Sequence, residues 1–323
     1  MISALYNAVA SEKQIVRQAE CLFSHVRDVA YGLLFKNGEA RYGDDVFESE
    51  AFNEEYAEAT EALLGVLSET ENSASEVKNL AVGAFSNANI LSSVCLCSAI
   101  CELLLENGQN IPLDGFFGDM TEPENNKIAY MRNPYSDTAY MEFDRALGRA
   151  SVSYPDSFSA VCEEVYHGRA GYCILPYESS EDGTLYGFLK LIDKYELAPV
   201  MTVGVSTDPD PDVQRITSFV LLAKNVKRVY PELKAKGIKS EEYLKISVDA
   251  PNGNGAIDVM NAARLCGLSY VKTESIPVMW DSGRYMFSLT FKVDDADILP
   301  FLLWLKLSMP EATPHAVFSY LLF

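Results

Sequence analysis

Arg215 and Thr217 are the two residues whose type and spacing most directly suggest chemistry. They lie in QRITSFVLLA (214–223), where the β-branched and apolar residues predict a strand over 216–223. Side chains alternate between the two faces of a strand, so the guanidinium and the hydroxyl share a face. A guanidinium can hold a carboxylate through two hydrogen bonds. We hypothesise that Arg215, or Arg132 in the loop at 132–134, holds a carboxylate of a ligand; that both are ordinary surface arginines is an interpretation of at least equal weight.

The seven cysteines of the sequence indicate neither a metal site nor a disulfide framework. They form no CxxC pair, and no histidine accompanies Cys97 and Cys101, which lie four residues apart in a predicted helix. An odd count also argues against complete pairing into disulfides. We therefore expect buried thiols in a reducing cytoplasm.

The charge of the chain excludes some classes of partner. Its 323 residues include 26 basic and 46 acidic residues, a formal net charge of −20. Nucleic acids and anionic membranes attract a basic surface, so neither is expected as a partner. Residues 1–125 hold 21 acidic and six basic residues, whereas residues 126–323 hold 25 and 20. Because the acidity is concentrated away from Arg215, it does not exclude an anionic ligand there.

The sequence predicts a cytoplasmic protein without a membrane span. Its first residues, MISALYNAVASEKQ, lack the basic segment and long apolar core of a signal peptide. The most apolar stretch, 80–105, is interrupted by asparagine, serine and glutamate, which indicates a buried helix.

Helical periodicity and turn residues divide the chain into three regions. Residues 1–120 are expected to form a helical domain with helices at 15–33, 47–67 and 74–105, and TEPENNK (121–127) is expected to be a linker. Strands at 127–131, 171–176, 198–206 and 216–223 then alternate with helices at 138–147, 157–167 and 185–195, an α/β organisation. The last region is expected to form a ferredoxin-like βαββαβ pattern. Its predicted elements are strand (243–248), helix (255–266), strand (268–279), strand (284–293), helix (296–307) and strand (316–322).

Four sets of motifs, in order along the chain, resemble the prephenate dehydratase family. SFSAVCEEVYHGRAGYCILPYESSEDGTL (157–185) resembles its central signature, and IAYMRNPYSDTA (128–139) its opening motif. QRITSFVLLA stands where the family has T-R-F. GAI (255–257) and ESIP (274–277) resemble motifs of the phenylalanine-binding ACT domain that follows. The resemblance covers residues 127–323.

The resemblance implies both an architecture and an activity. It implies a two-subdomain, periplasmic-binding-protein-like α/β dehydratase domain over 127–235 and an ACT regulatory domain over 241–323. The implied reaction is the decarboxylating dehydration of prephenate to phenylpyruvate in L-phenylalanine biosynthesis, without a metal or organic cofactor. Phenylalanine would regulate the enzyme, which would be a homodimer or homotetramer assembled through the ACT domain.

The resemblance also implies roles for individual residues. Thr217 would donate a proton to the leaving hydroxyl, with Glu178 and Ser180 as further catalytic residues. Glu178, Ser179 and Ser180 would line a cleft between the two subdomains, where Ser179 would bind substrate. Tyr135 and Ser136 would lie at a helix start, where backbone N–H groups can bind a carboxylate. The effector site would comprise Gly255, Ala256 and Ile257 at a helix start and Glu274 and Ser275 on a strand.

Several departures from the family pattern leave alternatives open. Ser218 replaces the arginine of T-R-F, Ser179 replaces an asparagine, and the loop at 132–134 lacks both glycines of the family motif. Ile276 replaces an arginine of the ACT motif. The alternative function is a catalytically inactive relative that senses an aromatic amino acid or another small anion. The helical domain is either a degenerate chorismate mutase-like domain or an unrelated oligomerisation domain.

Overall fold

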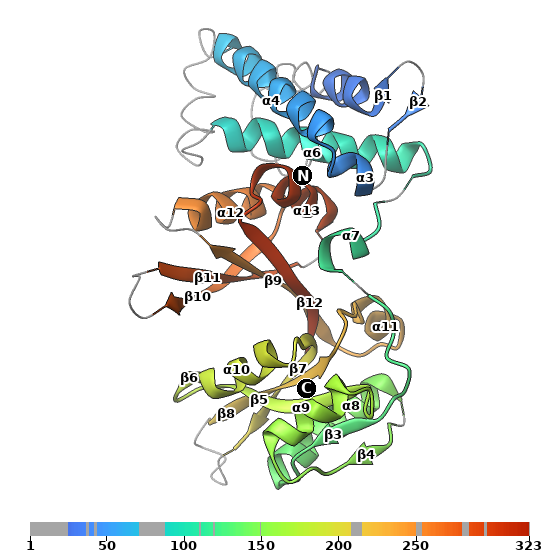
Figure 1. The fold of residues 1–323 in the computed structure, drawn as a ribbon, viewed down its shortest axis with the longest axis vertical. Coiled ribbons are helices and arrows are strands. Elements are labelled where there is room, and N and C mark those ends of the chain that lie inside the picture. The colour runs from blue at the N-terminus through green and yellow to red at the C-terminus, as the bar shows by residue number, and fades with distance from the viewer. Residues whose placement is uncertain are drawn as a thin grey trace. The chain divides into compact units, whose positions relative to one another are not determined.

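The computed structural model describes residues 25–36, 39–41, 44–70, 88–109, 111–118, 120–148, 150–207, 215–249, 254–279, 284–293 and 296–322. The chain divides into two compact units (Figure 1). Unit 1 comprises residues 1–116 and 246–314, and unit 2 comprises residues 117–245 and 315–323.

Unit 2 is built on one mixed sheet. Its strand order is β12–β7–β8–β5–β3–β4, with the short β6 paired to β5. The strands are β3 (Ile128–Tyr130), β4 (Val152–Ser153), β5 (Tyr172–Ser179), β6 (Gly183–Thr184), β7 (Ala198–Ser206), β8 (Ile216–Ala223) and β12 (Ala312–Leu321), the last of which enters unit 2 at residue 315. β8 is antiparallel to both of its neighbours, β5 and β7, whereas β3 is parallel to β5 and β12 is parallel to β7.

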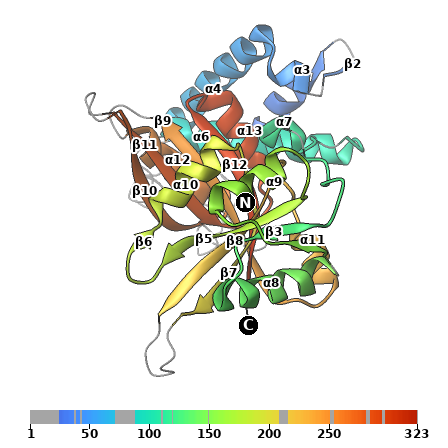
Figure 2. The same ribbon diagram turned by 60° about the horizontal axis from the view of Figure 1, so that its bottom comes forward.

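Helices cover both faces of this sheet (Figure 2). Helices α8 (Pro134–Leu147) and α11 (Tyr230–Ala235) pack on one face, and α9 (Phe158–Tyr166) and α10 (Tyr186–Lys194) pack on the other. We call these the α8 face and the α9 face. Along β8, Leu221 points to the α8 face and Val220 and Leu222 point to the α9 face, as strand alternation requires.

The predicted elements of residues 127–235 are largely confirmed. β7 and β8 have the predicted bounds, and α8, α9 and α10 lie where helices were expected, with α8 beginning four residues earlier. The described strands of this region join a single sheet, so a division into two subdomains is not seen among them. The site residues therefore lie at the end of one sheet.

Unit 1 contains most of the predicted βαββαβ pattern, and the order of elements is confirmed. It runs β9 (Ser240–Asp249), α12 (Asn254–Leu265), β10 (Ser269–Met279), β11 (Arg284–Lys292), α13 (Leu299–Ser308) and β12, of which β9 enters unit 1 at residue 246. β10 pairs antiparallel with β11, and β11 lies beside β9. The assignment of this pattern as an ACT regulatory domain stays a prediction.

Helices from the N-terminal region pack against this pattern within unit 1. The remaining elements of unit 1 are β1 (Phe35–Lys36), β2 (Glu39–Ala40), α3 (Asp44–Phe47), α4 (Glu50–Thr70), α6 (Ala88–Glu106) and the first three residues of α7 (Asp114–Phe117). α6 contacts α4, α12 and α13. The Trp304 indole donates a hydrogen bond to Ser93 Oγ (2.9 Å), and the Tyr56 and Ser308 hydroxyls are 3.0 Å apart. These helices therefore share a core with α13, and the predicted boundaries 1–120, 127–235 and 241–323 stay a prediction.

Two N-terminal helices were predicted partly over residues that lie outside the described part. Of the helix expected at 15–33, residues 25–34 are described and helical, and of the helix expected at 74–105, the described part begins at Ala88. No helix in the described part of the chain is long and apolar enough to cross a membrane.

The described cysteines confirm the prediction of buried thiols. Cys95, Cys97, Cys162, Cys173 and Cys266 are buried and not in disulfides, and Cys101 is free and half-buried. Burial raises the pKa of Cys95 and that of Cys97 to about 12, so both are protonated thiols at neutral pH. Cys21 lies outside the described residues.

Candidate functional site at the start of β8

Thr217 lies at the start of β8, between β5 and β7. It pairs with Ser179 of β5 on one side and with Val205 of β7 on the other. Cross-strand partners share a face, and Thr217 has the same parity as Phe219, which packs on the α8 face. The Thr217 hydroxyl is half-buried and has no hydrogen-bond partner in the part of the chain that the structure describes. The structure thus brings Thr217 and Ser179 together on the α8 face.

Glu178 points away from Thr217. The register between β5 and β8 shifts by one residue between Pro176 and Glu178, so that Glu178 pairs with Ser218 rather than Thr217. Ser218 has the parity of Val220, which packs on the α9 face. The predicted catalytic residues Thr217 and Glu178 therefore lie on opposite faces of the sheet.

Ser180 closes the end of the ladder between β5 and β8. Its Oγ accepts a hydrogen bond from the Ile216 N–H (3.1 Å), and its own N–H donates to the Ile216 carbonyl (2.9 Å). The Ser179 Oγ accepts from the Glu181 N–H (3.2 Å), which fixes the turn that follows β5. Both hydroxyls make local bonds that position the backbone.

Each of the two candidate arginines is held by a carboxylate of the chain. Arg215 Nε lies 2.8 Å from Glu181 Oε1, and both side chains are about half exposed. Arg132 Nε lies 3.5 Å from Asp137 Oδ2, and its guanidinium lies over the Tyr154 ring, 5.2 Å from the ring centroid. A ligand carboxylate would have to displace these partners to bind either arginine.

The start of α8 is capped by a side chain. Asn133 Oδ1 accepts hydrogen bonds from the backbone N–H groups of Tyr135 (3.0 Å) and Ser136 (2.9 Å), and its Nδ2 donates to Ser136 Oγ (2.7 Å). Pro134 occupies the first turn, where its missing N–H costs nothing. The N–H groups predicted to bind a substrate carboxylate are therefore already satisfied by Asn133.

Tyr135 connects the start of α8 to the strands that carry Thr217. Its hydroxyl donates to the Thr207 carbonyl (3.0 Å), and the Thr207 N–H donates to the Arg215 carbonyl (2.8 Å). Tyr135, Arg215 and Thr217 consequently lie at the same end of the sheet. We call this the Thr217 end, where β8 begins and β5 and β7 finish.

The Thr217 end can supply a hydrogen-bond donor directly, and it can supply a cation only after an ion pair is broken. The Thr217 hydroxyl can donate a hydrogen bond to a group on the α8 face. A cation becomes available only if a ligand displaces Glu181 or Asp137, and exposed ion pairs of this kind stabilise a protein by about 0–1 kcal/mol. Among the described residues, no group of three His, Cys, Asp or Glu side chains is arranged to hold a metal ion.

The predicted effector residues lie in α12 and β10 of unit 1. Gly255, Ala256 and Ile257 lie near the start of α12, where Ala256 is buried and Ile257 is exposed. Glu274 is buried in β10 opposite Ser288, and Ser275 is exposed. α12 packs on β10, so both sets of residues lie on elements that touch. Their role in binding an effector stays a prediction.

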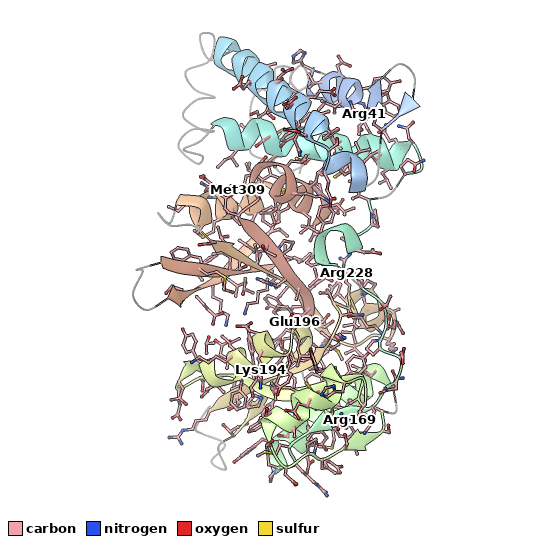
Figure 3. The ribbon with its side chains drawn as sticks, viewed as in Figure 1. Arg41, Arg169, Lys194, Glu196, Arg228 and Met309 are labelled. Carbon is pink, nitrogen blue, oxygen red and sulfur yellow. The ribbon has the colours of Figure 1, made fainter. Side chains whose placement is uncertain are left out.

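One ion pair and one lysine–tyrosine hydrogen bond in unit 2 were missed from the sequence. Arg228, which is labelled in Figure 3, holds the buried Glu242 through two hydrogen bonds of 2.8 Å. Lys245 Nζ donates to Tyr177 Oη (2.5 Å). A signal for the first pair was present, because Glu242 shares the apolar parity of Leu244, Ile246 and Val248, and a buried carboxylate needs a partner. No local pattern pointed to the second pair.

Comparisons with known proteins add resemblances at the level of the fold. No family model matches the chain, and no curated protein matches it. The chain is similar to the X-ray structure of prephenate dehydratase from Streptococcus mutans (16% identity, 61% of this chain and 99% of that chain, TM-score 0.49). It is also similar to GqqA, a quorum quenching acylase (16%, 60% and 94%, TM-score 0.43), and to prephenate dehydratase from Arthrobacter aurescens in complex with L-Phe (12%, 59% and 89%, TM-score 0.43). At these identities and scores, the resemblances assign neither an activity nor a ligand to this chain.

Proposed function

We propose that the chain is a lyase that binds a small dicarboxylate of the prephenate type at the Thr217 end and converts it to phenylpyruvate. The observation that carries the proposal is the half-buried Thr217 hydroxyl, which has no hydrogen-bond partner in the described part of the chain and lies on the same face as Ser179. The ordered motifs of residues 127–323 support the same reaction. The strand, the turn and the helix start that those motifs occupy meet at this end of the sheet.

The reaction requires a proton donor and a counter-ion for carboxylate. As prephenate loses carbon dioxide, the electron pair of the broken carbon–carbon bond enters the ring, the ring becomes aromatic, and hydroxide leaves. The Thr217 hydroxyl would donate its proton to that leaving oxygen, giving water, and would recover a proton from solvent. Arg215 would hold the second carboxylate after exchanging Glu181 for the substrate.

The experiment is a prephenate turnover assay, read as phenylpyruvate absorbance in alkali. We expect turnover above the spontaneous rate, and a loss of about 10²–10⁴-fold in kcat for Thr217→Val. Thr202→Val is the matched control, because Thr202 is a buried threonine of β7 whose hydroxyl has no hydrogen-bond partner among the described residues. Turnover that survives in Thr217→Val would contradict the assigned role of Thr217.

A second candidate function is supported by the arginine contacts and the Asn133 cap. If Arg215 and Arg132 keep their carboxylate partners, and Asn133 keeps the N–H groups of α8, unit 2 cannot bind a dianion tightly. The chain would then be an inactive relative that senses an aromatic amino acid or another small anion. Absence of turnover together with a rise in melting temperature on adding phenylalanine would support this function.

The proposal also includes regulation of the enzyme by phenylalanine and assembly of several copies of the chain. Phenylalanine would bind near the start of α12 and at Glu274 and Ser275 of β10, and two or four copies would associate through the βαββαβ elements. We expect phenylalanine to protect α12 and β10 from hydrogen exchange, and Glu274→Gln to remove that protection. Light scattering would give the number of copies.

A further inference from the structure

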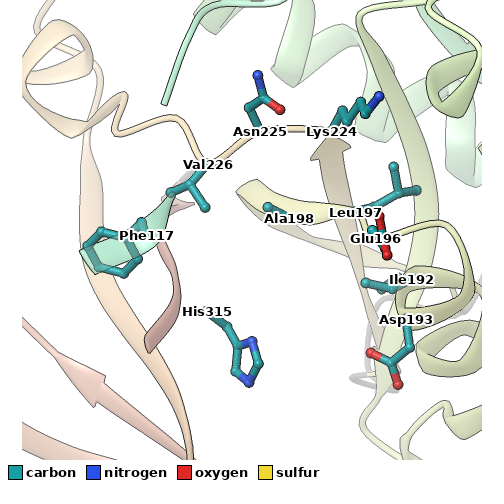
Figure 4. Close-up of a pocket in the computed structure, with 10 residues that line it drawn as sticks. All are labelled: Phe117, Ile192, Asp193, Glu196, Leu197, Ala198, Lys224, Asn225, Val226 and His315. Atoms are coloured by element: carbon teal, nitrogen blue, oxygen red, sulfur yellow. The ribbon is translucent and has the colours of Figure 1, made fainter. Parts of the chain in front are cut away.

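A pocket lies at the other end of β8 from Thr217, within unit 2. Its volume is about 430 Å³, which is in the range of small-molecule sites. The pocket is lined by Phe117, Ile192, Asp193, Glu196, Leu197, Ala198, Lys224, Asn225, Val226 and His315 (Figure 4). Lys224 follows the last residue of β8, so the pocket is roughly 23 Å along the strand from Thr217. It is therefore separate from the site of the proposed reaction.

The charges that face this pocket are negative. Asp193 and Glu196 lie on one side of it and Phe117 and Val226 on the other (Figure 4). Neither carboxylate forms an ion pair or a side-chain hydrogen bond in the part of the chain that the structure describes. Both side chains are exposed, and two like charges at one site attract a cation.

The basic and amide side chains of the lining do not neutralise the two carboxylates. The Lys224 ammonium lies over the Tyr166 ring, 5.8 Å from the ring centroid, and points away from the pocket. The Asn225 amide donates to Thr121 Oγ1 (2.8 Å). Desolvation and the Lys245 ammonium lower the pKa of His315, although Asp193 opposes this, so protonation of the imidazole is disfavoured.

Glu196 lines the pocket although its backbone conformation is unfavourable for a residue other than glycine. It is the one non-glycine residue with positive φ (51°) in the described chain. It follows the end of α10, where the Glu196 N–H bonds to the Asp193 carbonyl (3.2 Å) and the Leu197 N–H to the Ile192 carbonyl (3.0 Å). This is a Schellman motif, whose left-handed position glycine normally occupies.

The surrounding contacts impose this backbone conformation. Tyr195, the last residue before Glu196, is buried and its hydroxyl donates to Glu163 Oε1 (2.9 Å). Leu197 and Ile192, which flank the motif, are both buried in the core of the α9 face. Glycine would meet the same backbone requirement without strain, and only glutamate adds a carboxylate to the pocket.

We propose that this pocket binds a small organic ammonium ion, with its charged group at Asp193 and Glu196 and its apolar body against Phe117 and Val226. The carboxylates would accept the N–H groups of the ammonium, and the Phe117 ring would attract the cation through its face.

The test is titration of the full chain with 2-phenylethylammonium and with 3-phenylpropionate, two probes of similar shape and opposite charge. We expect the ammonium to bind with a Kd of about 1 mM and the carboxylate to bind at least about tenfold more weakly. n-Butylammonium serves as the aliphatic cation. Equal binding of the two phenyl probes, or no binding of either ammonium at about 10 mM, would overturn the proposal.

Variants test whether the carboxylates are responsible. Asp193→Asn and Glu196→Gln should each weaken 2-phenylethylammonium binding by about tenfold, whereas Asp156→Asn, which removes an exposed carboxylate elsewhere in unit 2, should not. Glu196→Gly should weaken binding equally and yet raise the melting temperature by about 2 °C, because glycine relieves the backbone strain. Unchanged binding in Asp193→Asn and Glu196→Gln would overturn the assignment.

Discussion

The polar side chains at the two ends of the β5–β8 ladder differ in whether the chain itself pairs them. At the Thr217 end, Arg215 is paired with Glu181, and Asn133 satisfies the first N–H groups of α8. At the other end, Asp193 and Glu196 face a pocket without an ion pair in the described chain, and Glu196 holds a left-handed backbone.

This difference separates a structural requirement from a functional one. Groups that the chain pairs with itself are explained by folding, because unsatisfied polar groups cost free energy. Groups that have no hydrogen-bond or ion-pair partner in the described chain, among them Glu196 on its strained backbone, are not explained by such pairing. By this criterion the Thr217 end has one functional candidate, the Thr217 hydroxyl, and the pocket end has two.

The largest expected effect on stability comes from two glycines, one at each end of the sheet. A Cβ at Gly171, at the pocket end, would lie 1.9 Å from the Asn125 carbonyl oxygen, whereas one at Gly204, at the Thr217 end, would lie 2.8 Å from the Tyr320 hydroxyl. A backbone atom cannot move aside as a side-chain tip can. We expect Gly171→Ala to lower the free energy of unfolding by about 3 kcal/mol and Gly204→Ala by about 1 kcal/mol, measured in urea. Equal losses would show that Tyr320 is as fixed as the backbone.

The next effect tests the capped helix at the Thr217 end. Asn133→Ala removes the acceptor for Tyr135 and Ser136, so we expect the free energy of unfolding to fall by about 1 kcal/mol. Asn133→Asp, which keeps that acceptor, should lose much less. If both variants lose the same free energy, the contact from Asn133 Nδ2 to Ser136 Oγ is the important one.

A smaller, pH-dependent effect is expected at the pocket end. The folded pKa of His315 is lowered below 6.5, so the unfolded chain binds a proton more readily than the folded chain. His315 should therefore cost no stability above pH 6.5, and stability should be lost as the pH falls through the folded pKa. Lys245 strengthens this shift and Asp193 opposes it. Urea unfolding between about pH 7 and pH 5 should show a shallower fall for His315→Gln than for the parent; identical slopes would contradict the shift.

The smallest effect on stability, by contrast, should accompany a large effect on binding. Arg215→Ala removes a half-exposed ion pair, so we expect a change of less than about 1 kcal/mol in the free energy of unfolding. The same change should abolish saturation by prephenate if Arg215 holds a substrate carboxylate. Glu181→Gln, which removes the carboxylate that competes for Arg215, should instead tighten prephenate binding. If neither variant alters prephenate binding, Arg215 is an ordinary surface residue.

The sequence predicted the elements better than it predicted the site. Strong β-branched runs gave β7 and β8 their correct bounds, and periodicity gave the order of the βαββαβ elements. The register shift at Glu178 was not predictable, because a β-bulge depends on the partner strand. Without that shift, Glu178 would have paired with Thr217 and shared its face.

The pocket was missed for a different physical reason. Its lining comes from four segments, near residues 117, 192–198, 224–226 and 315, which only the fold brings together. The end of α10 was predicted at Tyr195, but glutamate in place of glycine gave no sign of a Schellman motif there. A sequence pattern can indicate where a helix ends without indicating which side chain its end presents.

One measurement tests the contrast between the two ends most directly. In an NMR titration of the assigned, full-length chain, 2-phenylethylammonium and prephenate would each be followed by amide chemical-shift changes. We expect the ammonium to perturb Glu196, Leu197 and Lys224, and prephenate to perturb Ser179, Thr217 and Ser218. Shifts from both ligands at the same end of β8, or prephenate shifts confined to the Glu196 end, would contradict the account.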